Sequence, residues 1–339
     1  MVVMSDLITL NHGSGGITSQ DLIKEIFIKS FGDPNAILSD SAILDIDSRK
    51  IAFTTDSFVI DPIFFPGGNI GKLAVCGTVN DIAVSGAIPK YLTASFILEE
   101  GLFIDDLKKI VVSMAKQAAF ANVKIVAGDT KVVQKGKCDK IFINTTGIGI
   151  LEKDYGYIST GEKIIAGDKI IVNGSIGDHS IAVLGARNEL EFKTEVKSDC
   201  ACLHELIQDV LKAGKQIKFM RDITRGGLAT VLNELLEIVN LGIELDEREI
   251  PMKESVRGLC EIIGFDPLYL ANEGKIIMVV CQNEVKDIVE IMKKNPLGKE
   301  SKVVGIITND NHKMVVGKTE VGGKRIINML QGEQLPRIC

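Results

Sequence analysis

Apolar and polar positions in the first 150 residues predict an α+β domain. Two β-prone runs lie on either side of the polar turn Asp47-Ser48-Arg49-Lys50, which indicates a hairpin. Helical and alternating patterns then follow in the order helix, strand, helix, strand, strand, which is typical of a mixed or antiparallel sheet covered by helices. The expected elements are the hairpin within 41–58, strands at 91–98, 124–127 and 141–150, and helices at 69–85 and 104–120.

The pattern changes beyond a boundary predicted at residues 156–167. Strands and helices then alternate, which indicates a separate α/β domain. Segment 220–227 is expected to begin the helix at 228–239. The other expected elements are strands at 169–172, 276–280, 303–307 and 313–316, and helices at 180–184, 203–213, 256–263 and 285–293. We therefore expect an N-terminal domain over residues 1–155, a C-terminal domain over 156–330 and a mobile tail over 331–339.

Composition narrows the class of protein. The 339 residues carry a net charge of −6 and no Trp, which disfavours a nucleic-acid binder, because such proteins present basic faces and stacking platforms. No apolar run reaches membrane-spanning length and the N-terminus lacks a signal peptide pattern, so we expect a cytoplasmic protein. Seven cysteines without CxxC pairs and four histidines predict neither a disulfide framework nor a zinc site.

The tail ends on a thiol, Cys339. An extended chain from Gly332 to Cys339 reaches roughly 23 Å, which is long enough to cross the mouth of an active site. Pro336 stiffens the tail. A terminal cysteine is often just an exposed thiol; the alternative is a sulfur that enters a reaction centre as a tethered substrate. The neighbouring terminal carboxylate disfavours the thiolate, and Arg337 is a candidate to offset it.

Acidic residues recur at the ends of predicted strands, as at Asp56 and Asp129. Such placement suits a site for a cation and a triphosphate. The glycine-rich loop at residues 11–16, which contains Gly15 and Gly16, lacks the spacing and the lysine of a P-loop. Its backbone N–H groups can approach phosphate, but a simple flexible arm fits the sequence equally well.

Several motifs together resemble the ATP-binding superfamily of aminoimidazole ribonucleotide synthetase (PurM), selenophosphate synthetase and thiamine-monophosphate kinase. With His12-Gly-Ser-Gly-Gly near one end and Pro336-Arg-Ile-Cys at the other, the resemblance narrows to the HypE family of hydrogenase maturation proteins. The superfamily motifs are Thr54-Thr55-Asp56, Asn80-Asp81-Ile82-Ala83, Gly128-Asp129-Thr130, Arg221-Asp222-Ile223-Thr224-Arg225-Gly226-Gly227 and Asn272-Glu273-Gly274.

The resemblance implies a PurM-like two-domain fold and a homodimer in which the N-terminal domains pair their sheets. It also implies that ATP and Mg²⁺ bind between the domains. The implied magnesium ligands are Asp40, Asp81 and Asp222, and the implied nucleotide-site residues are Asp56, Asp129, Gly128, Gly15 and Gly16.

The implied reaction is ATP-dependent dehydration of a carbamoyl group carried on Cys339 to a thiocyanate. The implied partners are the carbamoyltransferase HypF as donor and the HypC–HypD complex as cyanide acceptor. Glu273 and Lys131 are the implied proton-transfer groups, although Glu273 could instead pair with Lys275 and Lys131 could instead contact phosphate. Two other functions remain open, an enzyme of the same fold acting on a free small molecule, and an assembly protein that uses its tail for docking.

Overall fold

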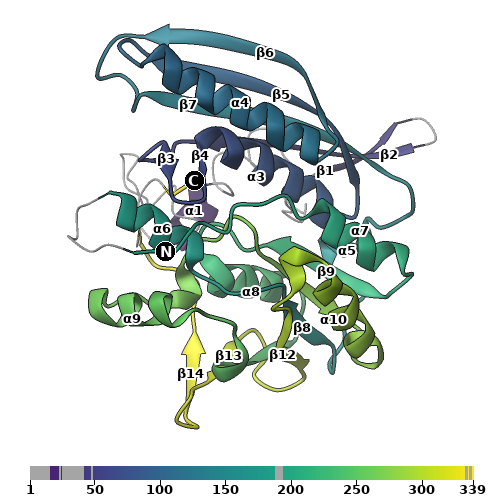
Figure 1. Cartoon of the computed structure of the whole chain (residues 1–339). Helices are drawn as coiled ribbons and strands as arrows, with labels where there is room; N and C mark the ends of the chain where they lie inside the picture. Colours follow the sequence, from purple (N-terminus) through teal and green to yellow (C-terminus); the bar gives the residue numbers. More distant parts are fainter. Residues whose placement is uncertain are drawn as a thin grey trace.

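The computed structural model describes residues 16–22, 24, 42–46, 49–187, 194–332, 335 and 338–339. Two sheets with their helices form two layers, and α3 lies between them (Figure 1). Asp40, Gly15, Pro336 and Arg337 lie outside the described residues. No helix in the described part of the chain is long and apolar enough to cross a membrane.

The first sheet is mixed, as the sequence predicts. β5 pairs with β6 in parallel, and the pairs β1·β2, β2·β7 and β5·β7 are antiparallel. A short ribbon of β3 and β4 stands apart. The strands in order across the sheet are β1 (Ala42–Ile46), β2 (Arg49–Phe58), β7 (Ile141–Leu151), β5 (Ile88–Glu99) and β6 (Lys124–Val133), and the ribbon is β3 (Phe64–Phe65) with β4 (Gly68–Asn69).

Two helices pack on this sheet, α3 (Ile70–Val84) and α4 (Ile104–Phe120). Asn69 caps α3, since its side-chain oxygen accepts from the backbone N–H groups of Gly71 and Lys72 at 2.9 and 3.1 Å. Most of α3 is buried around its whole circumference, because the first sheet covers one side and the second domain covers the other. This helix therefore joins the two domains.

The second sheet has seven strands in the order β14-β13-β10-β12-β8-β11-β9. Apart from the parallel pair β10·β13, its neighbouring strands are antiparallel. The bounds are β8 (Lys169–Val172), β9 (Ile217–Asp222), β10 (Gly242–Asp246), β11 (Ile276–Val280), β12 (Lys302–Thr308), β13 (Val315–Lys318) and β14 (Lys324–Ile327).

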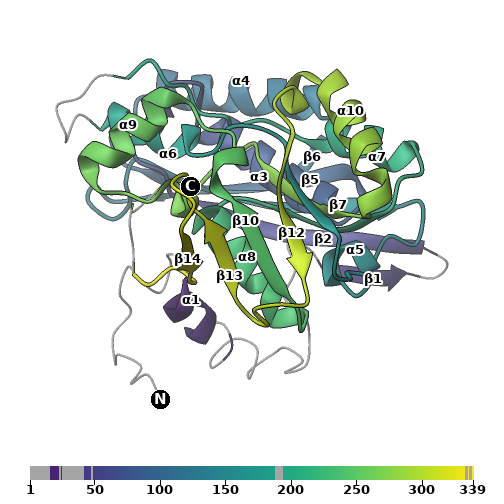
Figure 2. The ribbon, with the colours of Figure 1, turned by 90° about the horizontal axis from the view of Figure 1, so that it is seen from below.

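Helices cover both faces of the second sheet (Figure 2). α8 packs with one apolar cluster, and α7 and α10 pack with the other, so β11 is buried along its whole length. The helices are α5 (Tyr157–Thr160), α6 (Asp178–Ala186), α7 (His204–Lys212), α8 (Gly227–Ile238), α9 (Glu254–Ile263) and α10 (Val285–Lys294), with short 3-10 turns at Glu247–Glu249, Pro267–Tyr269, Gln282–Glu284 and Pro296–Gly298.

Three strands of this sheet are absent from the sequence prediction, β9, β10 and β14. The expectation that residues 220–222 begin a helix is wrong, because they end strand β9, and the helix begins at Gly227. β9 contains buried charged residues whose partners lie elsewhere in the second domain. Lys218 binds Asp168 at 2.8 Å, and Arg221 binds Glu234 at 2.7 Å. In the sequence alone, such charged residues are typical of a polar loop, because the partners that allow their burial are not apparent.

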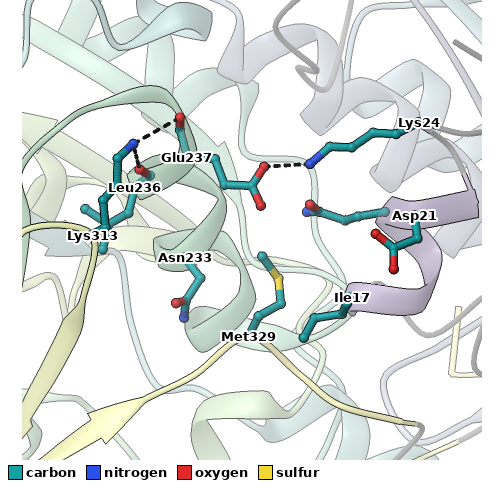
Figure 3. A pocket seen from close by; sticks show the side chains of 9 residues that line it. Ile17, Asp21, Lys24, Asn233, Leu236, Glu237, Lys313 and Met329 are labelled. Atoms are coloured by element: carbon teal, nitrogen blue, oxygen red, sulfur yellow. Dashed lines mark hydrogen bonds and ion pairs between the residues drawn. The ribbon is translucent and has the colours of Figure 1, made fainter. Parts of the chain in front are cut away.

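The short helix α1 (Ile17–Leu22) attaches the described N-terminal residues to the second domain. Gln20 donates to Glu234 at 2.9 Å and Lys24 pairs with Glu237 at 2.9 Å, both on α8. A cavity of about 580 Å³ lies between α1 and α8, with Lys24 directed at Glu237 across it (Figure 3). The Ile17 N–H also donates to the Leu330 carbonyl at 3.2 Å, so α1 holds the chain just before the tail.

Candidate active site

The last two residues of the chain are inserted between the domains, beside β4 (Figure 1). Ile338 is buried, and the half-buried Cys339 packs against the apolar cluster of the first domain. Two hydrogen bonds hold this end. The Val59 N–H donates to the Cys339 carbonyl at 3.1 Å, and His179 Nε2 lies 2.7 Å from the Ile338 carbonyl. Ile338 and Cys339 therefore have a defined position between the domains.

Carboxylates surround the inserted thiol. Burial raises the pKa of Cys339 to about 12, with Arg225 opposing the shift and the charges of Glu273, Asp56 and Asp222 adding to it. These residues come from both domains, since Asp56 lies on β2 and Asp222 ends β9. At neutral pH the thiol in this position is protonated.

Glu273 is the most strongly perturbed acid of the group. Its side chain is 3% exposed, and its Oε1 has no hydrogen-bond partner among the residues that the structure describes. Burial raises its pKa well above the usual value, and nearby acidic groups add to the shift. The proposed alternative of a pair with Lys275 is wrong, because Lys275 Nζ binds Asp199 at 3.0 Å instead. Glu273 is thus a buried carboxyl group with an unused acceptor atom.

Asp56 and Asp81 form a second acidic group on the first domain. Thr54 Oγ1 donates to Asp81 Oδ2 at 2.8 Å. Burial raises the pKa of Asp56, while the charge of Arg225 and a hydrogen bond with Asp81 lower it. Two carboxyl groups in hydrogen-bond contact repel each other when both are ionised, so a cation at this position would relieve the repulsion.

The turn between β9 and α8 carries Arg225. Gly226 and Gly227 have φ angles of +78° and +63°, the left-handed region that favours glycine. A Cβ on Gly227 would also collide with the carbonyl of Leu268. The adjacent glycines therefore allow the sharp turn, which brings Arg225 close enough for Cys339 to be the main influence that raises its pKa.

The described residues contain no group of three or more His, Cys, Asp or Glu side chains arranged to hold a metal ion. The described carboxylates nevertheless suit Mg²⁺, which prefers oxygen ligands and in nucleotide sites is held by one or two carboxylates together with phosphates and water. Asp56, Asp81 and Asp222 provide that chemistry beside the inserted tail.

Three predicted residues lie apart from this group. Gly128, Asp129 and Lys131 are on β6, the edge strand of the first sheet, and their side chains or backbone are exposed. Lys131 pairs with Asp129 at 2.9 Å. Gly16 lies against the carbonyl of Leu330, at the base of the tail. Within one chain, the described structure therefore brings together Cys339, Glu273, Asp56, Asp81 and Asp222.

Sequence reasoning missed four residues of the site. Arg225 and His179 lie next to the inserted tail, whereas Ser198 contacts His179 and Asp199 contacts the backbone of Glu273. Arg225 was visible as a positive charge within the motif that ends in Gly226-Gly227. His179 follows Gly177-Asp178 in a glycine-rich turn, a weak signal on its own. Ser198 and Asp199 carry no motif, and only the fold reveals that they belong to the site.

The raised pKa of Glu273 predicts how Glu273→Gln changes stability with pH. Unfolded Glu ionises near 4.5, whereas the folded group holds its proton to higher pH, so the stabilisation is complete below pH 4.5 and is lost as the pH rises through the folded pKa. Gln does not titrate. Glu273→Gln should therefore gain stability relative to wild type at pH 8 but much less at pH 4.5.

Urea unfolding of both proteins at the two pH values measures this difference. Glu290→Gln, on an exposed position of α10, is the matched control, since an exposed side chain has no burial penalty to relieve. A Glu273→Gln variant that is less stable than wild type at pH 8 would contradict the assignment.

Two family models match the chain. The model of the AIR synthase related protein N-terminal domain matches residues 38–151, and that of the C-terminal domain matches residues 166–318, which confirms the predicted PurM-like fold. A carbamoyl dehydratase HypE of Rhodobacter capsulatus is 45% identical over 343 aligned residues, covering 100% of both chains.

Solved structures of HypE proteins are also similar to this chain. A HypE–HypF complex matches with a TM-score of 0.84 and 46% identity, over 91% of this chain and 99% of that chain. HypE in complex with ATP matches with a TM-score of 0.82 and 43% identity, over 98% of this chain and 100% of that chain. From its first domain to its inserted terminal cysteine, this chain belongs to the HypE family of carbamoyl dehydratases.

Proposed function

We propose that this chain uses ATP to dehydrate a carbamoyl group carried on Cys339 to a thiocyanate, the cyanide source for a NiFe hydrogenase. The observation that carries the proposal is the insertion of Cys339 beside Glu273, a buried carboxyl group with one oxygen that has no hydrogen-bond partner among the described residues. Relatives named carbamoyl dehydratase, and a relative solved with ATP, support the activity and the nucleotide.

The chemistry follows from the weakness of an amide oxygen as a leaving group. Transfer of the γ-phosphoryl group of ATP to the carbamoyl oxygen makes it a phosphate, and loss of this phosphate with two N–H protons leaves S–C≡N, ADP and inorganic phosphate. Glu273 is placed to accept a proton from nitrogen, because burial makes its carboxylate a stronger base than an exposed one. Arg225 supplies positive charge beside the reacting sulfur.

Asp81 and Asp222, with Asp40, are the residues we propose to hold Mg²⁺, and Asp56 lies next to them. When bound, the ion would neutralise charge on the transferring phosphoryl group. Without it, the clustered carboxylates would repel the triphosphate.

The relative solved with HypF supports HypF as a partner, and we propose that HypF donates the carbamoyl group. We propose HypC–HypD as the acceptor of the cyanide. A carrier that visits a donor, an ATP site and an acceptor must leave its inserted position between steps. On mixing with the acceptor complex, a cyanated chain should therefore return to the mass of the unmodified protein.

Intact-mass analysis tests the dehydration. After incubation with HypF, its substrates and ATP, the wild-type chain should gain one carbamoyl group at Cys339 and then lose one water. Cys339→Ala should gain nothing, while Glu273→Gln should gain the carbamoyl group but lose water roughly 100-fold more slowly or worse. An adduct at another cysteine, or normal turnover by Cys339→Ala, would show that the carrier assignment is wrong.

Calorimetry tests the metal. Asp81→Asn removes one charge from the acidic group, so ATP affinity in Mg²⁺ should fall about tenfold or more, the equivalent of about 1.4 kcal/mol. EDTA should also lower the affinity of the wild type for ATP. Asp105→Asn, on the exposed start of α4, is the control and should bind like wild type. Unchanged ATP affinity in EDTA would remove the ion from the proposal.

The first sheet offers a surface for the proposed homodimer. Nearly all of edge strand β6 is exposed, including Ile125, Val126 and Val132. Phe53 and Tyr91 are also exposed on the strands of the same sheet. An apolar edge strand with open backbone groups is a template for pairing with another strand, and a second copy of this chain offers the same edge. Such pairing would place Asp129 and Lys131 at a joint site.

Light scattering after size exclusion tests this arrangement. Wild type should elute with twice the 36.8 kDa mass of one chain. Val126 is 58% exposed on β6, and Val126→Lys should shift the protein toward monomer, because a charge cannot be buried cheaply in the paired edge. Val321→Lys, between β13 and β14, is the control. A monomeric wild type at micromolar concentration would contradict the dimer.

A further inference from the structure

The inserted tail is held by a histidine that the motifs do not mark. His179, at the start of α6, is 0% exposed. Its Nε2 lies 2.7 Å from the Ile338 carbonyl and its Nδ1 lies 2.7 Å from Ser198 Oγ. The ring also packs edge-on against Phe65, with centroids 5.4 Å apart. This ring therefore has a fixed position and uses both nitrogens.

The hydrogen bonds fix the tautomer of the ring. A carbonyl can only accept, so His179 Nε2 carries the proton that it donates to Ile338. In the neutral ring Nδ1 then accepts, and the hydroxyl of Ser198 donates to it. Ser198 Oγ in turn accepts from the Cys200 N–H at 3.1 Å. Burial lowers the pKa of His179, which agrees with a neutral ring. We call His179, Ser198 and the Ile338 carbonyl the tail latch.

The segment that contains Ser198 also holds the backbone of Glu273. The Glu273 N–H donates to Asp199 Oδ1 at 3.1 Å, and the Ala201 N–H donates to the Glu273 carbonyl at 3.3 Å. The Ser198 N–H itself donates to the Pro66 carbonyl at 2.8 Å, which ties the segment to the first domain. One short segment therefore sets the positions of both the tail and the proposed base.

We propose that His179 is a positioning residue, which sets the fraction of tails that are inserted and so presents Cys339 to Glu273. Insertion buries the Ile338 carbonyl, which water solvates when the tail is outside. A buried carbonyl without a hydrogen-bond donor destabilises the inserted state of the tail. His179 donates to this carbonyl and so stabilises the inserted state. The catalytic consequence rests on the function proposed above, whereas the effect on tail position does not.

The test compares two variants that differ in where an amide N–H sits. His179→Gln can place its amide near the position of Nε2 and keep the donor for Ile338, whereas His179→Asn reaches only to the position of Nδ1. The measurement is the rate at which iodoacetamide alkylates Cys339 in the nucleotide-free full-length protein, followed by peptide mass spectrometry. We expect His179→Asn to react roughly fivefold faster than wild type, the ratio that corresponds to the loss of one net hydrogen bond. His179→Gln should stay nearer wild type.

Two controls distinguish the loss of the tail latch from a general loosening of the fold. His204→Asn changes a histidine of α7 that packs on Phe120, and it should leave Cys339 alkylation unchanged. Alkylation of the half-buried Cys281 and the thermal melting curve report on the rest of the fold. Ser198→Ala removes the proton donor to Nδ1 without emptying the ring site. It should raise Cys339 alkylation severalfold, and it keeps the test valid if His179→Asn does not fold.

Equal alkylation of Cys339 in wild type, His179→Asn and Ser198→Ala would overturn the proposal. So would a wild-type rate equal to that of an unstructured thiol, or equal acceleration in His179→Gln and His179→Asn. The carbamoylated chain gives a second readout, in which His179→Asn should slow water loss without slowing loading by the donor. If wild type loses no water, the proposed function fails, while the alkylation result still decides the latch.

Discussion

A thiol at the end of a chain can reach a buried reaction centre only if the backbone that carries it is also buried. Each polar group of that backbone must then find a partner inside the protein. Here the donors come from opposite sides, Val59 from the first domain and His179 from the second. The inserted tail therefore depends on the two domains being correctly placed, and α3 together with segment 198–203 supplies that placement. Asn80 of α3 donates to the Ala201 carbonyl and accepts from the Leu203 N–H, at 3.0 and 2.8 Å.

The electrostatics at this position oppose folding. Several carboxyl groups face a protonated thiol, and the positive charge of Arg225 lies close to Cys339. Burying several acidic groups close together costs stability even when they are hydrogen-bonded, so this cluster is better explained by function than by folding. The acids suit different tasks, because Asp56 and Asp81 are paired and suit a cation, whereas Glu273 has an acceptor atom that no group in the described part of the chain uses. Binding of a metal ion and a triphosphate would change the net charge around Asp56 and Asp81. Glu273 would stay beside the sulfur of Cys339.

Elements with a strong periodic pattern could be predicted from the sequence, as α4 and β7 show. β9 could not, because Lys218, Arg221 and Asp222 are charged residues in a buried strand, and they are tolerated there by partners such as Asp168 and Glu234. The same limit applies to the site. Asp56, Asp81, Asp222 and Glu273 stand in motifs, whereas the partner of Ile338 lies 159 residues away in sequence and is set by the fold alone. The exposed position of Lys131 on an edge strand could not be predicted either, because the order of strands in a sheet does not follow from the local sequence.

Holding and releasing the tail place opposite demands on the same contacts. Burial of the Ile338 side chain favours insertion by about 1.5–3 kcal/mol, the usual range for a large aliphatic residue. Desolvation of the Cys339 thiol among carboxylates and the loss of tail entropy oppose it. A single hydrogen bond worth about 1 kcal/mol shifts the ratio of inserted to released tails severalfold. A tail bound by many such contacts would not leave for a partner, and a tail with none would rarely meet Glu273. One buried histidine that donates to the Ile338 carbonyl is therefore a physically reasonable compromise for a covalent carrier.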